Sequence, residues 1–351
     1  MRGLGLERGE MLGLTDKTVR ESDYAAIPHD ASFAQIQKME PDVQWRNVRE
    51  QVGSMVGPES IERILARFKQ MTGYDLETQV IPSIGDTASF YLSDSTGGSS
   101  FLSSVMLVKL DDPETFHDFW LSVTGLANGM IAQQIAGEPV AVRFSNFEID
   151  GTPFTQIQTP GLPLPFEPTF SVANGWLVMG ATPQACHSAV RQAKFARRDI
   201  TDNDMFDEAM EGLPEVTSVA FVDSSKTVRD GYPYLTMLGS AVANMVRPKS
   251  PDAPRQPGMV TPLYGDLVDD VQPLVTFTRW NGDDYTIESR ADASMMVNIA
   301  AVLGTGDIGD ILSSAFAGGA IGAAIASEAD EAVGEIREDW GEEWEDDWDE
   351  E

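Results

Sequence analysis

Cysteine and histidine are scarce in this sequence, and their scarcity argues against several kinds of chemistry. The 351 residues include one cysteine and three histidines. A lone cysteine, Cys186, cannot form a disulfide within the chain, and its place among small apolar residues is typical of a buried hydrophobe. Three scattered histidines argue against a histidine-based zinc site and offer little to activate a serine: His29, His117 and His187.

Basic residues are few compared with acidic ones. The chain has 24 Lys and Arg against 56 Asp and Glu, which gives a net charge of −32. Nucleic acids and anionic membranes need clustered Lys and Arg, so neither is expected as a direct partner. In so acidic a chain, neighbouring acids are expected by chance. We interpret such pairs as solvated turn or cap residues rather than a general acid and base: Asp111/Asp112, Asp269/Asp270 and Asp283/Asp284.

Long apolar runs are also lacking. A membrane-spanning helix needs about 20 apolar residues, and the nearest candidate, ILSSAFAGGAIGAAIA at 311–326, is short and consists mostly of small residues. We interpret it as a soluble helix or linker. Residues 1–24 have no uninterrupted apolar stretch of the kind found in a signal peptide. The expectation is therefore a cytoplasmic protein or a true start upstream of Met1.

Catalytic and cofactor motifs are missing as well. There is no Gly-x-Ser-x-Gly, and the Gly-rich stretch at 94–100 is not followed by the Gly-Lys-Ser/Thr of a phosphate loop. GTGDIGD at 304–310 offers oxygen ligands without the spacing of a known calcium loop. We predict no catalytic residue, no cofactor and no metal, so the protein is expected not to be an enzyme.

The clearest structural signal that is present lies at residues 169–190. Asn174-Gly175, between two apolar runs, favours a two-residue hairpin turn. The second run, at 176–179, is apolar on both faces and predicts a strand covered on both sides. Thr182-Pro183 is typical of a helix start, and the helix that follows has a face of small residues.

The remaining patterns predict an α+β fold with mostly antiparallel sheets and packed helices. An aromatic stripe on the helix after Pro113 is expected to be core: Phe116, Phe119, Trp120, Val123 and Ala127. Strands are predicted at 31–36, 87–93, 104–110, 140–144, 147–149, 154–158, 216–223, 274–280 and 285–289.

A short internal similarity suggests two unequal, related halves. The segment starting at Ile27-Pro28 aligns without gaps on the segment starting at Leu213-Pro214. The predicted organisation is a disordered leader at 1–25, one half at 26–212, a smaller half at 213–304 with a Pro-rich loop at 247–262, a Gly/Ala-rich segment at 305–326 and an acidic tail at 327–351.

The order of these motifs resembles a bacterial family, domain of unknown function 3352. The resemblance rests on four stretches: Ile27-Pro28 with Asp30-Ala31-Ser32, Gly85-Asp86-Thr87-Ala88, Lys109 to Glu114, and Asn174 to Ala185. It covers about residues 26–300. It implies an α+β protein of the cell envelope or periplasm, often behind an N-terminal anchor or signal that is not evident in this sequence, and no known activity.

The acidic tail is the most unusual local feature. Residues 327–351 hold 14 acidic residues and one arginine, so the tail is expected to be disordered. Four apolar residues recur every fourth position and would form one stripe on a helix: Ile336, Trp340, Trp344 and Trp348. Tryptophan is a common interface anchor, which makes this stripe a candidate docking motif for a basic, grooved protein surface. A merely solubilising tail is the alternative.

Three functions remain open from the sequence. The leading hypothesis is a non-enzymatic envelope protein that binds or scaffolds a partner through the tail. The alternative is a carrier that holds an apolar ligand between the sheet and the helices bearing Ile64, Phe116 and Trp120, because apolar, aromatic-rich interiors are common in ligand pockets. The third is an enzyme whose site is assembled from distant residues, such as acids gathered around one of the histidines.

Overall fold

The computed structural model describes residues 15–98, 100–134, 142–160, 166–195, 198–213, 215–246, 263–268, 271–280 and 285–291. Their ten strands form one continuous sheet, in the order β10-β9-β8-β1-β2-β3-β7-β6-β5-β4, and every neighbouring pair is antiparallel. The predicted α+β class with antiparallel strands is confirmed. The strands are β1 (Ala31–Lys38), β2 (Ile84–Ser93), β3 (Val105–Leu110), β4 (Arg143–Ile149), β5 (Thr152–Gln158), β6 (Thr169–Ala173), β7 (Trp176–Gly180), β8 (Ser218–Val222), β9 (Leu274–Trp280) and β10 (Tyr285–Arg290).

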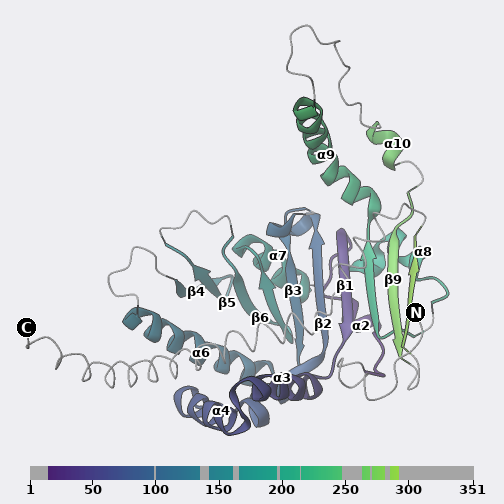
Figure 1. The fold of residues 1–351 in the computed structure, drawn as a ribbon. Coiled ribbons are helices and arrows are strands. Elements are labelled where there is room, and N and C mark those ends of the chain that lie inside the picture. The colour runs from purple at the N-terminus through teal and green to yellow at the C-terminus, as the bar shows by residue number, and fades with distance from the viewer. Residues whose placement is uncertain are drawn as a thin grey trace, which may run out of the picture.

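The helical elements gather on the two faces and at the ends of this sheet (Figure 1). They are α2 (Glu21–Tyr24), α3 (Pro41–Val56), α4 (Pro58–Thr72), the π-helix η1 (Leu76–Val80), α5 (Ile81–Ser83), the 3-10 turns η2 (Asp94–Thr96), η3 (Phe101–Ser103) and η4 (Ile200–Asp202), α6 (Pro113–Gln134), α7 (Pro183–Phe195), α8 (Asp204–Met210), α9 (Ser224–Val246) and α10 (Tyr264–Val268).

Local sequence explains most element boundaries. Asn174 and Gly175 have φ of 50° and 78°, as the predicted hairpin turn requires, and the turn at Asp150-Gly151 between β4 and β5 is similar, with φ of 50° and 74°. Thr182 accepts a hydrogen bond from the backbone N–H of Ala185 at 3.2 Å and begins α7. The two strands predicted at 140–144 and 147–149 are in fact one, β4, because its pairing with β5 is unbroken from Arg143 to Ile149.

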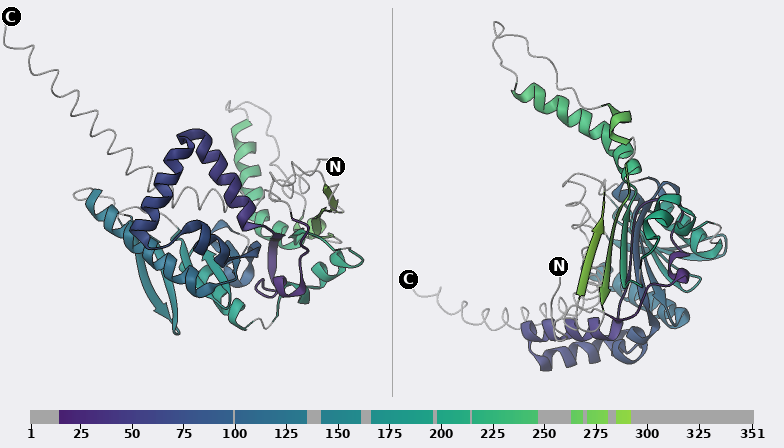
Figure 2. Two further views of the ribbon diagram at one scale, coloured as in Figure 1. Left: turned by 90° about the horizontal axis from the view of Figure 1, so that it is seen from below. Right: turned by 90° about the vertical axis from the view of Figure 1, so that its right-hand side faces the viewer.

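One face of the sheet, here called the α7 face, is closed by α2, α7 and α8 (Figure 2). Alternate strand residues such as Ile36, Leu107 and Val178 pack there against the small side chains of α7. Gly180 allows the closest approach, because a Cβ at this position would lie 2.4 Å from the backbone N of Cys186. Cys186 itself is fully buried, and burial raises the pKa of its thiol, as expected of a structural cysteine.

The opposite face, here called the open face, is covered at one end of its strands by α4, η1, α5 and α6. Phe68, Phe116 and Phe119 are buried there against Val108 and Leu177. The expectation that residues 176–179 form a strand covered on both sides is therefore confirmed, since Trp176 packs on the α7 face and Leu177 on the open face. Ile64, also buried, is part of the packed interior.

The first described residues correct one prediction. Residues 15–25 were expected to belong to a disordered leader, but α2 lies within them, and both Asp23 and Tyr24 are buried. Asp23 accepts hydrogen bonds from Lys38 and Lys109 of neighbouring strands. A contact between positions far apart in the sequence thus orders this segment, and local composition does not reveal such a contact. Residues 1–14 lie outside the described residues.

Two long helices stand away from the sheet or run across its end. In Figure 1, α9 rises from the upper end of the sheet with α10 beside it, and Tyr232 of α9 contacts Tyr264 of α10 with ring centroids 5.6 Å apart. At the other end, Asn128 of α6 exchanges two 2.8 Å hydrogen bonds with the backbone of Phe144 in the edge strand β4. These bonds hold α6 against the last strands of the sheet. None of the described helices is long and apolar enough to cross a membrane.

Candidate functional site

A row of large apolar side chains crosses the open face beyond the edge of the helical cover. Phe90 is the register partner of Met106, Met106 of Met179, and Met179 of Phe170. These four residues, here called the apolar row, come from adjacent strands β2, β3, β7 and β6. All four are half-buried. At the usual spacing between strands, the row is roughly 14 Å long.

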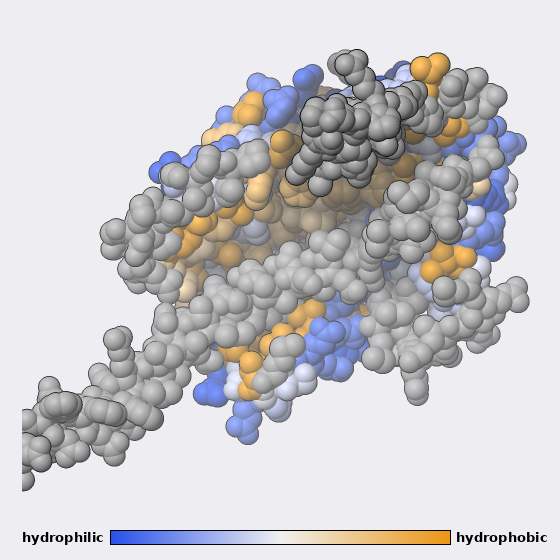
Figure 3. Space-filling model, turned by 45° about the horizontal axis from the view of Figure 1, so that its top comes forward, coloured by the Kyte–Doolittle hydropathy of each residue, from blue (hydrophilic) through white to orange (hydrophobic). Residues whose placement is uncertain are grey.

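The apolar row lies at the border between covered and uncovered sheet. Ala88, Val108 and Leu177 lie two residues along the same strands and are buried under the helices. On β1, Phe33 extends the row on the other side, with its ring 5.8 Å from that of Phe90. Figure 3 looks toward this face and shows a hollow with a hydrophobic floor. An apolar surface of this kind, on a sheet, is uncommon unless something binds to it.

A pocket adjoins the Phe170 end of the apolar row. It has a volume of about 40 Å³ and lies between α6 and the strands β4 to β7. Helical spacing places three α6 side chains on its wall, and the facing strands supply polar and aromatic ones: His117, Trp120, Leu121, Asn146, Thr155 and Phe170. The Trp120 and Phe170 rings are in contact, with centroids 4.9 Å apart.

One residue on the pocket wall carries an unsatisfied hydrogen-bond donor. The indole Nε1 of Trp120 is buried and has no hydrogen-bond partner within the described part of the chain. Two hydroxyls on the pocket wall bond to other groups: the Thr155 hydroxyl donates to Asn146 Oδ1 at 2.9 Å, and the Ser171 hydroxyl donates to the Pro153 carbonyl at 2.8 Å. Buried donors are normally paired, so an exception in a pocket requires an explanation.

The sequence only partly anticipated this site. Trp120 was expected to be core, and the alternative hypothesis placed a ligand near it. The structure buries Phe116 and Ile64 completely in the packed interior, and it places Trp120 on the pocket wall. His117, one of the three scattered histidines, is half-buried and lines the pocket. The apolar row depends on the register of four strands, which the sequence does not specify.

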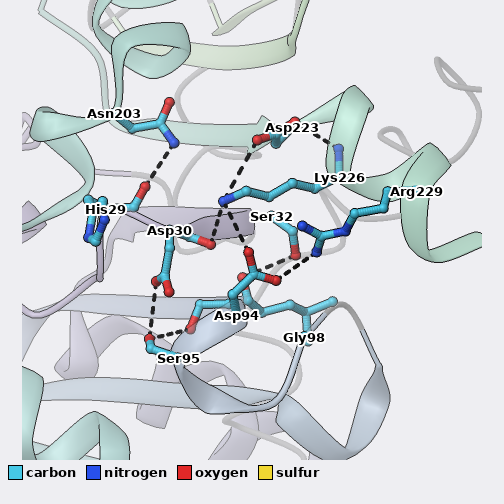
Figure 4. Close-up of polar contacts among 12 residues, drawn as sticks. His29, Asp30, Ser32, Asp94, Ser95, Gly98, Asn203, Asp223, Lys226 and Arg229 are labelled. Carbon is cyan, nitrogen blue, oxygen red and sulfur yellow. Dashed lines mark hydrogen bonds and ion pairs between the residues drawn. The ribbon is translucent and has the colours of Figure 1, made fainter. Parts of the chain in front are cut away.

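A second candidate is a polar corner at the start of β1, shown in Figure 4. It brings together three acids from separate segments: Asp30, Asp94 and Asp223. Lys226 Nζ lies 3.7 Å from Asp94 Oδ2 and 3.9 Å from Asp223 Oδ2, and Arg229 donates to Asp94 at 2.7 Å.

Hydrogen bonds complete the pairing in this corner. Asp30 accepts from the Ser95 hydroxyl at 3.1 Å, and Asp223 caps α9 by accepting from the backbone N–H of Lys226 at 3.0 Å. His29 takes part through its carbonyl, which accepts from Asn203 at 2.8 Å, while its ring points away from the carboxylates in Figure 4. We interpret the corner as a clamp that fastens α9 and the 94–98 turn to β1.

The other sequence-based candidates fall into two groups. Asp112 accepts from the backbone N–H and the hydroxyl of Thr115 at the start of α6, which bears out its reading as a cap, and Asp111 is exposed. Within the described ranges no group of three or more His, Cys, Asp or Glu could hold a metal ion. The docking residues Ile336, Trp340, Trp344 and Trp348, the oxygen-rich 304–310 stretch and the other two acid pairs lie outside the described residues.

Comparisons with known proteins add little to this geometry. No family model matches the chain, and no curated protein matches it. One solved structure, crystal form I of TP0453, aligns over 82% of this chain and 86% of its own, with 7% identity and a TM-score of 0.30. That likeness is too weak to support any argument about fold or function. The site therefore has to be interpreted from its own residues.

Proposed function

We propose that this chain is a non-catalytic binding protein that holds an elongated apolar molecule on the open face of its sheet. One observation carries the proposal: the apolar row of Phe90, Met106, Met179 and Phe170 is half-exposed and runs into a pocket. Covering this row with a ligand removes apolar surface from water, at about 25 cal/mol for each Å².

The composition of the apolar row favours a ligand of variable shape. Its two central members are Met106 and Met179, which face each other across β3 and β7. Methionine is unbranched and polarizable, and it adapts to irregular partners better than branched side chains do. The row ends at the aromatic rings of Phe90 and Phe170, which are larger and more rigid than the two methionines. We expect the protein to select its ligands by the length of their apolar chain rather than by a detailed pattern of polar groups.

The polar corner supports binding over catalysis. Its carboxylates are held by Lys226, Arg229 and the Ser95 hydroxyl, and these contacts tie α9 and the 94–98 turn to β1. We propose that this corner is structural. Two further proposals remain: that the acidic tail docks a partner, and that the protein lies in the cell envelope, as the resemblance implies.

The proposal is tested with an environment-sensitive apolar dye, anilinonaphthalene sulfonate, and matched substitutions. Met106→Gln combined with Met179→Gln keeps side-chain length but places amides in the apolar row, and we expect dye affinity to fall at least about tenfold. Met237→Gln is the control, because Met237 is 60% exposed on α9. Equal dye binding by the wild type and both variants would show that the apolar row is not the binding site.

A further inference from the structure

A larger cavity lies at the opposite edge of the sheet, where α8 runs beside β9 at the right of Figure 1. It has a volume of about 420 Å³, within the range of small-molecule sites, about 300–1,000 Å³. Its wall includes Val275, which packs on the α7 face. This edge cavity is therefore separate from the apolar row, which crosses the open face.

The guanidinium of Arg290, at the end of β10, lines the edge cavity. It lies over the buried ring of Phe277, 5.2 Å from the centroid, and its Nε donates to Glu288 at 3.3 Å. The Arg290 side chain is 45% exposed, so dissolved molecules reach it. Its two terminal nitrogens have no partner among the described residues. Such a fork of N–H groups matches the two oxygens of a carboxylate.

A negative charge comes to the same cavity from a different element. Glu208 belongs to α8, lines the edge cavity and is exposed to solvent. In the part of the chain that the structure describes, its carboxylate forms no ion pair. An ammonium group has three N–H donors and the opposite charge, so it is a suitable partner for this carboxylate.

The overall charge of the protein favours a ligand that carries both charges. With a net charge of −32, the protein repels a simple anion as it approaches Arg290. A simple cation is attracted to the protein but meets the Arg290 guanidinium within the cavity. A zwitterion has no net charge to be repelled, and it offers one group to each of the two side chains.

The remaining wall and the size of the edge cavity point to an aliphatic spacer between the two charges. Ala209 and Pro273 are half-buried apolar residues on the wall, and covering them with methylene groups removes apolar surface from water. A sphere of about 420 Å³ is roughly 9 Å across. That is wider than glycine, in which the ammonium and the carboxylate are attached to the same carbon.

We propose that the edge cavity binds a small aliphatic amino-carboxylate. The ligand carboxylate accepts hydrogen bonds from the terminal nitrogens of Arg290, and the ligand ammonium donates to Glu208. Phe277 acts as a positioning residue, because its ring holds the guanidinium at the cavity. This site is independent of the proposed function, since its ligand is polar at both ends and binds on the other face of the sheet.

The test compares three probes of equal chain length on the full chain: 6-aminohexanoate, hexanoate and hexylamine. NMR follows the Nε–H resonance of Arg290 in isotope-labelled protein, and Arg290→Gln assigns it. We expect 6-aminohexanoate to shift this resonance saturably and to bind at least about fivefold more tightly than either single-charge analogue, because each analogue lacks one ion pair.

Two substitutions assign the charges. Glu208→Gln should weaken binding of 6-aminohexanoate about fivefold and leave it no better than hexanoate, and Arg290→Gln should leave it no better than hexylamine. Asp207→Asn on α8 and Arg143→Gln on the far edge strand remove the same charges outside the cavity and should bind as the wild type does.

The proposal is wrong if the three probes bind the wild type equally, if 6-aminohexanoate causes no saturable shift, or if Glu208→Gln keeps the preference for the zwitterion over hexanoate. The comparison of probes on the wild type does not depend on whether any variant folds. Binding of anilinonaphthalene sulfonate on the apolar row is measured separately, so failure here leaves the proposed function standing.

Discussion

Lys38 Nζ lies 2.7 Å from a carboxylate oxygen of Asp23, and both side chains are almost entirely closed to solvent. Lys38 also contacts Asp86 at 2.9 Å, and Lys109 contacts the other oxygen of Asp23 at 2.8 Å. This ion cluster fastens α2 to three strands of the sheet. Lys38 and Lys109 alternate with Ile36 and Leu107 on the α7 face, opposite the apolar row, and the cluster can be tested through stability alone.

Removing the charge of Asp23 should destabilise the fold strongly. Asp23→Asn leaves the Lys38 ammonium buried without its closest partner, and breaking a buried pair in this way costs about 3–5 kcal/mol. Urea unfolding measures the change. Glu62→Gln is the control, because the Arg49–Glu62 pair is solvent-exposed and should contribute at most about 1 kcal/mol. Equal effects of the two substitutions would contradict this account of the cluster.

The same cluster predicts how stability depends on pH. Burial raises the pKa of Asp23, but hydrogen bonds from Lys109 and Lys38 outweigh it, and the pKa ends below its ordinary value of 3.8. The pKa of Asp86 is also lowered, where burial is again opposed by Lys38. A carboxyl whose pKa is lowered by folding stabilises the fold above its unfolded pKa and loses this contribution as pH falls through its folded pKa.

We therefore expect the unfolding free energy of the wild type to fall from about pH 4 downward, below the unfolded pKa of an aspartate. Asp23→Asn should show a shallower decline over the same range, because one of the titrating groups is gone. Denaturant unfolding at a series of pH values measures both slopes. Parallel curves for the two proteins would show that Asp23 titrates alike in the folded and unfolded states.

Replacing either of two glycines with alanine should change the stability of the protein in opposite directions. Gly180→Ala places a Cβ 2.4 Å from the backbone N and 2.8 Å from the Cα of Cys186, so α7 must move away from β7, at a cost of about 1–3 kcal/mol or more. Gly125→Ala lies within α6 and meets no atom within 4 Å. It should stabilise the protein by about 0.5–1 kcal/mol. Thermal unfolding of both variants measures the two changes in stability. Destabilisation by Gly125→Ala would contradict this expectation.

The acidic tail gives a prediction that depends on sequence alone. If Trp340, Trp344 and Trp348 anchor a partner, replacing all three with Ala should abolish capture of that partner from the native lysate, as deletion of 327–351 should. The triple variant keeps every acidic residue of the tail, so it separates apolar anchoring from bulk charge. A partner set that is the same for wild type, triple variant and deletion would remove the docking role.

Local chemistry predicted much of the fold. The Asn174-Gly175 turn, the Thr182 cap and the small-residue face of α7 could all be predicted, because each depends on residues within a few positions of one another. The α2 segment was misread, because its order comes from Lys38 and Lys109, which lie on strands far along the chain. The proposed relation between the two halves stays a prediction.

The candidate site was less predictable for the same reason. The apolar row exists only because β7 pairs with β3 on one side and β6 on the other, in a register that aligns Met106, Met179 and Phe170. Each of these residues looks like ordinary core within its own strand. The unpaired N–H of Trp120 is likewise a property of its surroundings. Sequence periodicity identified the correct helix but not which of its residues would face a pocket.

The most direct test of binding on the apolar row follows the methionine methyl groups by NMR during titration with anilinonaphthalene sulfonate, with assignments from the single Met→Gln variants. The account predicts that the Met106 and Met179 methyl resonances shift together and saturate with one binding curve, while the Met237 methyl on exposed α9 does not move. Saturable shifts at Met237 with none at Met106 and Met179, or no saturable shift anywhere, would contradict binding on the open face of the sheet.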